Sequence, residues 1–379
     1  AVTTPLSAAA TDALTALGGA PSFTAAPVPY DSGTIDGAAF DSLPGVGFEL
    51  NATAAAIVPP AGTAVGRGPV LLVDPAQNNA FRAVNRAWRA GGTVRFVPAA
   101  ANRGARYAIS GVSEAAVNDL VSSLALQAER ATGAPGTVVK KPRVGLYRPW
   151  QASMDEGWTR WVLEQYGFDY LNLAPGDLHG AVALADRIDV LIIGDEARSL
   201  MDGYAAGVVP PQFTGGIGAD GVRALDAFVR GGGTLVCFNR SGLFAIDQLH
   251  LKVKNAVAGA TRQEFFTGGS ILEVEVETAQ PVMAGMPARA PIFVDASPAF
   301  EPQDGFAGEV LARYQAAGSP LLSGYLAGEK YLNGTAAALQ VTHEKGRVIL
   351  LGFRPQWRGQ PFGTFRVIFN AVLASGLTE

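Results

Sequence analysis

The chain has 379 residues, about the length of two domains of roughly 100–200 residues each, and 48% of them are hydrophobic, which is enough for sizeable cores. The net charge is −4 and no block of lysine and arginine stands out, Lys140-Lys141 being only a pair, so nucleic acid is not expected as a partner, because phosphate binding needs a basic stripe. No apolar run reaches the ~20 residues of a membrane-spanning helix, so no membrane span is expected.

The N-terminal part of the chain predicts a small α/β domain over residues 1–137. An Ala-rich helix is expected at 5–18, and a second helix at 113–128 with Ser113 as its N-cap. The clearest unit is a strand, a helix and a strand, at 70–73, 77–90 and 93–97. This order predicts parallel neighbouring strands joined by a right-handed crossover. A turn-rich linker then places the domain boundary near 137.

The second domain, 138–379, predicts a mostly parallel sheet. Its strands are expected at 143–147, 168–173, 188–194 and 234–238, and its first helices at 155–166 and 219–230. Apolar strands that alternate with helices indicate a parallel sheet covered on both faces. From residue 270 the pattern becomes that of half-exposed strands, at 271–277 and 347–353 among others, before a closing helix at 363–375.

Three stretches of the second domain resemble a known family. They are Arg143-Val-Gly-Leu-Tyr147 with Met154-Asp-Glu-Gly-Trp-Thr-Arg-Trp161, Pro210-Pro-Gln-Phe-Thr-Gly-Gly-Ile-Gly218, and Gly352-Phe-Arg-Pro-Gln356. Together they resemble the class-I-glutaminase-like (flavodoxin-like) domain that follows the peptidase domain of exported bacterial zinc carboxypeptidase-like proteins. The resemblance covers about 142–379, and residues 60–137 more weakly resemble the α/β segment before that domain. The expected fold class is α/β, with a smaller N-terminal α/β domain and a flavodoxin-like parallel sheet carrying added antiparallel strands.

The zinc site of the peptidase family is missing from this chain. That family holds zinc with a His-x-x-Glu pair and a later histidine, and none of His179, His250 and His343 is followed by glutamate at that spacing. No metal, cofactor or catalytic residue is therefore expected. The resemblance implies a non-catalytic accessory or binding region of an exported protein that is periplasmic, cell-surface or extracellular. Its partners would be other subunits, copies of itself, or the peptidase domain of the same gene product.

Two other functions stay open. Charged residues make up only 16% of the chain, which also suits a structural or assembly subunit of an extracellular or cell-surface complex. A cysteine-dependent amidase or glutaminase would act through Cys237, the sole cysteine. Cys237 lies inside a predicted strand and not on the tight turn that such nucleophiles need, which favours a buried, inert thiol.

A Gly-x-Gly-x-x-Gly pattern at Gly216, Gly218 and Gly221 matches a dinucleotide-binding motif. Because no strand precedes it directly, we interpret it as a glycine loop leading into a helix capped by Asp220.

The first candidate binding residues are Arg148, Asp155 and Arg160, which follow the first strand of the predicted parallel sheet. Ligands in such folds bind beyond the carboxyl ends of the strands, so these residues predict a polar cleft. Trp158 and Trp161, at helical spacing with them, are expected in the core.

The second candidates are Arg354, Gln356 and Arg358, which follow the last strong strand. Their guanidinium groups could hold the carboxylate of a ligand, or could pair with Asp or Glu side chains and fix the closing helix. The sequence leaves both interpretations open.

Overall fold

The computed structural model describes residues 61–100, 103–180, 182–196 and 201–377. Gly62–Glu379 forms one compact unit and is described by itself. The helix expected at 5–18 lies outside the described residues. Within the described part of the chain, no helix is both long and apolar enough to cross a membrane.

The first sheet has the strand order β1-β5-β2-β4-β3-β6. Its strands are β1 (Thr63–Gly66), β2 (Val70–Val73), β3 (Thr93–Val97), β4 (Arg106–Ser110), β5 (Gln127–Ala131) and β6 (Thr137–Val138), and its helices are α2 (Asn79–Arg89) and α3 (Glu114–Ser123). β1 and β5 run parallel, and the other neighbouring pairs run antiparallel.

The strand–helix–strand unit predicted over 70–97 is present, but the expectation that its strands are parallel neighbours is wrong. β4 lies between β2 and β3 and pairs antiparallel with both. Tyr107, Ala108 and Ile109 of β4 are buried, so this short strand occupies the middle of the sheet. Sequence reasoning assigned no strand there, and the order of the sheet therefore could not be predicted.

Helix α3 is shorter than expected. The Ser113 hydroxyl accepts a hydrogen bond from the backbone N–H of Ala116 (3.2 Å), which confirms the predicted N-cap. The helix ends at Ser123, and Ala125 adopts a positive φ of 52°. The chain then turns directly into β5, whose residues had been included in part in the predicted helix.

The second sheet contains the parallel strands β7 (Val144–Tyr147), β8 (Tyr170–Leu173), β9 (Val190–Ile193), β10 (Thr234–Phe238) and β20 (Gly346–Leu351). Their spatial order is β8-β7-β9-β10-β20, and each neighbouring pair is parallel. Numbered by appearance, this is the order 2-1-3-4-5 of flavodoxin-like folds. The predicted flavodoxin-like α/β class is therefore confirmed. The predicted boundary near 137 falls at the last strand of the first sheet and stays a prediction.

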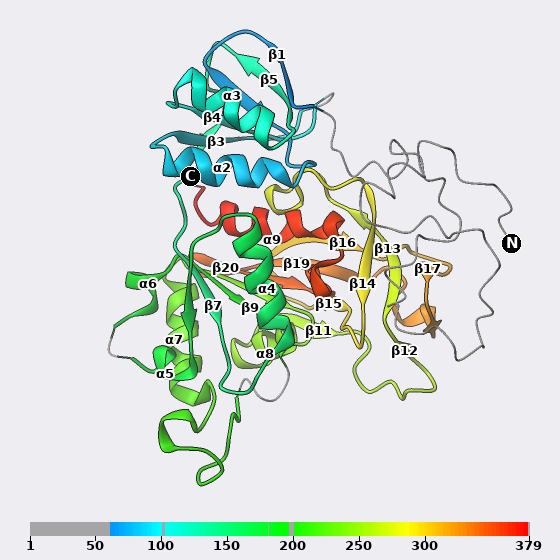
Figure 1. Ribbon diagram of the computed structural model, residues 1–379. Coiled ribbons are helices and arrows are strands. Elements are labelled where there is room, and N and C mark those ends of the chain that lie inside the picture. The colour runs from blue at the N-terminus through cyan, green and yellow to red at the C-terminus, as the bar shows by residue number, and fades with distance from the viewer. Residues whose placement is uncertain (1–60, 101–102, 181, 197–200, 378–379) are drawn as a thin grey trace, which may run out of the picture. The chain divides into compact units, whose positions relative to one another are not determined.

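Antiparallel strands extend the second sheet beyond β20, as expected (Figure 1). In spatial order they are β19 (Ala336–His343), β16 (Gly308–Arg313), β13 (Ser270–Val276) and β14 (Arg289–Val294). The shorter strands are β11 (Val253–Asn255), β12 (Phe266–Thr267), β15 (Phe300–Pro302), β17 (Leu321–Ser323) and β18 (Leu326–Ala327). The remaining α-helices are α4 (Met154–Gln165), α5 (Pro175–Leu178), α6 (Leu184–Arg187), α7 (Gly218–Arg230), α8 (Ser241–Gln248) and α9 (Phe362–Ala374).

Helices cover both faces of the parallel strands. In β9, Val190 and Ile192 belong to the same hydrophobic cluster as buried residues of α4 and α9, whereas Leu191 and Ile193 belong to the cluster of α7 and α8. This alternation follows from the period of two along a strand, which sends neighbouring side chains to opposite faces. A strand buried on both faces must be apolar along its whole length, which explains the run Val190–Ile193.

Helix α9 is buried on nearly every side because two layers pack on it. The Phe369 ring lies 4.9 Å from the ring of Phe81 in α2, and the Tyr107 hydroxyl in β4 donates to Asn370 Oδ1 (2.8 Å). Its other neighbours include the ring of Tyr166 at the end of α4, 4.7 Å from that of Phe369. One hydrophobic cluster contains the apolar residues of α9 together with buried residues of both sheets. The first sheet and the second sheet therefore share a core through α9.

Candidate functional site

The candidate site lies at the carboxyl ends of the parallel strands. The strand order reverses between β7 and β9, and in open α/β sheets ligands bind in the crevice at this point. Arg148 follows β7, Asp195 follows β9 and Arg240 follows β10, each within two residues of the strand end. Arg354 comes three residues after β20. The topology thus brings charged residues from four separate loops to one place.

Asp195 is the centre of a buried ion cluster. Its side chain is fully buried and receives the Arg240 guanidinium at both oxygens (Nε to Oδ1 2.8 Å, Nη2 to Oδ2 2.9 Å). Arg354 also donates to Oδ2, from Nε at 2.8 Å and from Nη2. Burial alone would raise the pKa of the Asp195 carboxyl, but the hydrogen bonds from Arg240 and the charge of Arg354 outweigh it and lower that pKa. Asp195 is therefore an ionised structural partner of two arginines.

Asp155 lies beside this cluster in a different electrostatic environment. Only 6% of the residue is exposed, and its Oδ2 is 3.7 Å from Arg354 Nη2. The Gln356 amide donates to its Oδ1 (3.2 Å). Burial raises the pKa of the Asp155 carboxyl to about 7, with Asp195 adding to the rise and Arg354 opposing it. The two carboxyls thus have pKa values displaced in opposite directions, and Asp155 titrates near neutral pH.

The turn from β10 to α8 has the shape of a nucleophile turn but lacks a nucleophile. Asn239 adopts a positive φ of 52° between the strand and the helix, the strained position where hydrolases of this general design hold serine or cysteine. The next backbone N–H, on Arg240, would serve as an oxyanion donor in such enzymes, but here it donates to Asp195 Oδ1 (3.1 Å). The turn is therefore used for structure.

A cavity of about 380 Å³ opens next to this cluster, at the carboxyl end of β7. Its aromatic side is formed by Trp150 and Phe213, whose rings pack edge to face at 5.2 Å. Its polar side includes Arg148, Glu156 and Arg160. Glu156 is 3% exposed, and its Oε2 accepts from Arg160 Nη2 at 2.7 Å. Trp150 Nε1 and Glu156 Oε1 are buried and have no hydrogen-bond partner among the described residues.

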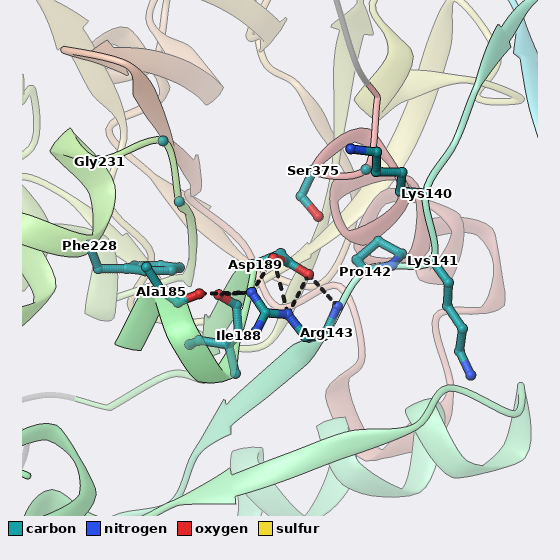
Figure 2. Close-up of a pocket in the computed structure, with 13 residues that line it drawn as sticks. Lys140, Lys141, Pro142, Arg143, Ala185, Ile188, Asp189, Phe228, Gly231 and Ser375 are labelled. Atoms are coloured by element: carbon teal, nitrogen blue, oxygen red, sulfur yellow. Dashed lines mark hydrogen bonds and ion pairs between the residues drawn. The ribbon is translucent and has the colours of Figure 1, made fainter. Parts of the chain in front are cut away.

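A second cavity, of about 420 Å³, lies at the amino ends of the strands and is shown in Figure 2. Arg143 points at Asp189 there, with a 2.7 Å ion pair, and also donates to the carbonyl groups of Ala185 and Asp186. Lys141 points away from them and pairs with Asp169 (2.7 Å). Arg143 and Lys141 are therefore neutralised by carboxylates of the protein itself.

The structure brings some of the predicted site residues together and separates others. Asp155, Arg354 and Gln356 meet in the buried cluster, where Arg354 pairs with carboxylates of the chain. Arg148 and Arg160 line the neighbouring cavity. Arg358 is exposed and stacks on the ring of Trp357 next to it, 4.3 Å from the ring centre. The sequence did not predict this division into a buried cluster and a cavity lining. It predicted one set of candidates after the first strand and another after the last strong strand.

Sequence reasoning missed Asp195, Arg240 and the role of Glu156. Asp195 follows the apolar run of β9 and Gly194, and this position at the end of a parallel strand was the available signal. Glu156 and Asp155 lie in the first turn of α4, a position where acidic residues commonly stabilise the helix dipole from the surface, yet both side chains are buried. The expectation that Trp161 lies in the core is wrong, since it is 45% exposed, because the inner face of α4 is taken by Thr159, Val162 and the two acidic residues.

The other motifs are structural in this fold. Cys237 is fully buried within β10, and burial raises the pKa of its thiol to about 12. The glycine pattern opens α7 without a preceding strand, but its predicted cap is wrong, since Asp220 pairs with Arg223 and no side chain caps the helix. His343 pairs with Asp226 (2.7 Å), near the start of β20. Among the described residues, no group of three histidine, cysteine or acidic side chains could hold a metal ion.

Comparison with known proteins gives resemblances in structure alone. No family model and no curated protein matches the chain. Among solved structures it is similar to a ThuA-like protein from Bacteroides uniformis (13% identity, 63% of this chain and 94% of that one, TM-score 0.37). It is also similar to PurLQS from Thermotoga maritima (14% identity, 61% of this chain and 98% of that one, TM-score 0.40). A third similar structure is a β-galactosidase from Bacillus circulans sp. alkalophilus, with 13% identity and a TM-score of 0.38. The match covers 64% of this chain but only 32% of that enzyme. The fold is therefore assigned from the strand order and not from these resemblances.

Proposed function

We infer that this chain is a non-catalytic, ligand-binding region with a flavodoxin-like fold. The observation that carries the inference is the turn at Asn239, which has no nucleophile and whose following amide, on Arg240, donates to Asp195. A covalent mechanism needs a nucleophile and a free oxyanion donor at such a turn. With both missing, the crevice and its neighbouring cavity are suited to binding.

The wider setting is proposed from the sequence resemblance alone. Residues 142–379 resemble the region that follows the peptidase domain of exported zinc carboxypeptidase-like proteins, so we propose an accessory role in a protein of that kind, outside the cytoplasm. Cell fractionation and intact-mass analysis of the native polypeptide test this setting. A native product recovered from the cytoplasm, or one without a peptidase domain, would contradict it.

Ammonia release from L-glutamine and from simple amides tests the absence of catalysis. We expect rates equal to those of buffer for the wild-type protein and for Cys237→Ala. The alternative of a cysteine amidase would gain support only from turnover that the Cys237→Ala change abolishes. The thiol of Cys237 is fully buried in β10, which argues against a cysteine amidase.

A further inference from the structure

We propose that the cavity beside α4 binds a neutral carbohydrate. This proposal deepens the proposed function and rests on it, because it takes the crevice as a place of binding without reaction. The cavity volume of about 380 Å³ lies within the ~300–1,000 Å³ range of small-molecule sites. Its place at the carboxyl end of β7, beside the reversal of strand order, is where this fold class holds ligands.

Two unsatisfied polar atoms define what the ligand must supply. Glu156 Oε1 is an acceptor and Trp150 Nε1 is a donor, and both are buried without a partner among the described residues. Leaving such atoms unpaired costs about 1–3 kcal/mol each, so a partner is strongly favoured. A hydroxyl group both donates and accepts, so it is the neutral group that can pair with either kind of atom.

The charges of the lining exclude the simpler ionic ligands. Arg160 already neutralises Glu156 through the 2.7 Å contact to Oε2, and Arg148 adds a further positive charge to the lining. An ammonium group would therefore meet two guanidinium groups. An anion would meet the unpaired carboxylate oxygen of Glu156 in a buried setting, where like charges repel strongly. A neutral donor avoids both conflicts.

The aromatic side of the cavity matches the apolar face of a sugar ring. Trp150 and Phe213 form an edge-to-face pair, and Phe213 remains 41% exposed. Aromatic rings provide a large apolar contact surface, and the indole N–H adds a polar group at its edge. A sugar ring combines a C–H face with hydroxyls around its rim, which is the combination that this lining accommodates.

Isothermal titration calorimetry on the full chain tests the proposal. The probes are D-glucose, D-galactose, D-mannose, N-acetyl-D-glucosamine and their β-linked disaccharides, with L-lysine and inorganic phosphate as ionic comparisons. We expect at least one neutral sugar to bind with Kd of about 1 mM or below, and the two ionic probes not to bind. The proposal is overturned if no neutral sugar binds at up to about 10 mM, or if lysine or phosphate binds more tightly than every sugar.

Matched variants locate the binding. Glu156→Gln should weaken sugar binding about 10-fold or more, because it replaces a charged acceptor by a neutral amide and weakens the hydrogen bond from Arg160. Glu164→Gln, an exposed site on the same helix, should not change binding. Because Glu156 is buried and its variant could unfold, Phe213→Leu serves as a second test, and we expect it to weaken binding several-fold with an unchanged circular dichroism spectrum. Sugar binding that neither variant affects would place the site elsewhere and overturn the proposal.

The outcomes separate this proposal from the function on which it rests. Absence of sugar binding together with absence of amide hydrolysis rejects the carbohydrate and leaves the non-catalytic function intact. Amide hydrolysis rejects the non-catalytic function whether or not a sugar binds.

Discussion

Arg240 and Asp195 are joined by three hydrogen bonds, two from the guanidinium group and one from the backbone N–H of the arginine. The carboxylate thus fixes both the side chain and the backbone turn that follows β10. This arrangement uses, inside the protein, the donor groups that an enzyme of this shape would present to a substrate. It also joins the ends of β9 and β10, together with the hydrogen bond from the Ser241 hydroxyl to the Ile193 carbonyl group.

Replacing Asp195 by Asn should destabilise the fold by about 2–4 kcal/mol, because it removes the charge of a fully buried carboxylate that accepts hydrogen bonds from both Arg240 and Arg354. The free energy of unfolding from urea denaturation measures this. Asp220→Asn is the matched control, since it removes an exposed pair with Arg223 and should change stability by less than about 0.5 kcal/mol. Equal effects of the two variants would show that the cluster adds nothing to stability.

Asp155 should make stability depend on pH between about 4 and 7. Its folded-state pKa of about 7 lies above the ordinary value of 3.8, so the folded state binds more protons in this interval and stability falls as pH rises. Asp155→Asn removes this dependence while keeping Oδ1, the acceptor for Gln356. We therefore expect the variant to gain stability over the wild type on going from pH 5 to pH 8.

Urea denaturation of both proteins at the two pH values gives this difference. Asp195 does not contribute to the change in stability between pH 5 and pH 8, because its lowered pKa affects stability only below about pH 4, where an ordinary aspartate becomes protonated. Asp119→Asn, at an exposed position, is the control. Its free energy of unfolding should differ from that of the wild type by the same amount at both pH values. A constant difference between wild type and Asp155→Asn would contradict the raised pKa.

Phe369→Ala should destabilise both sheets together, by about 3–5 kcal/mol, because its ring packs against Phe81 of α2 and Tyr166 at the end of α4, within the cluster that both sheets share. Hydrogen exchange measures this locally, and we expect amide protection in β2 and in β10 to fall by the same factor. Phe362→Ala, at a 58% exposed position at the start of α9, removes only an outer contact with Phe365 and should leave protection nearly unchanged. A loss confined to one sheet would show that the sheets unfold independently.

The parallel part of the fold could be predicted from the sequence because its signals are local. The runs Val190–Ile193 and Thr234–Phe238 are apolar throughout, and the stripe of α9 that includes Phe365 and Phe369 is wholly buried as expected. Such patterns depend on residues next to each other in the chain. The order of the strands depends on long-range pairing, and the insertion of β4 between β2 and β3 left no local trace.

The candidate site was predicted only in part for the same reason. Asp155 was predicted in one set of candidates and Arg354 and Gln356 in another, but nothing in the sequence shows that the side chains of residues 155 and 354 lie 3.7 Å apart. The burial of Glu156 also differs from what its position predicts. Acidic residues in the first turn of a helix normally face solvent, where they stabilise the helix dipole. Burial here comes from the loops that follow other strands.

The reactivity of the sole thiol tests most directly whether this crevice is closed to covalent chemistry. Native protein treated with iodoacetamide should leave Cys237 unlabelled, because the side chain is fully buried and its pKa is raised to about 12, and labelling should become complete in urea. Mass spectrometry of the labelled peptide reports both states. Rapid labelling of the folded protein, prevented by an amide substrate, would contradict a binding function without catalysis.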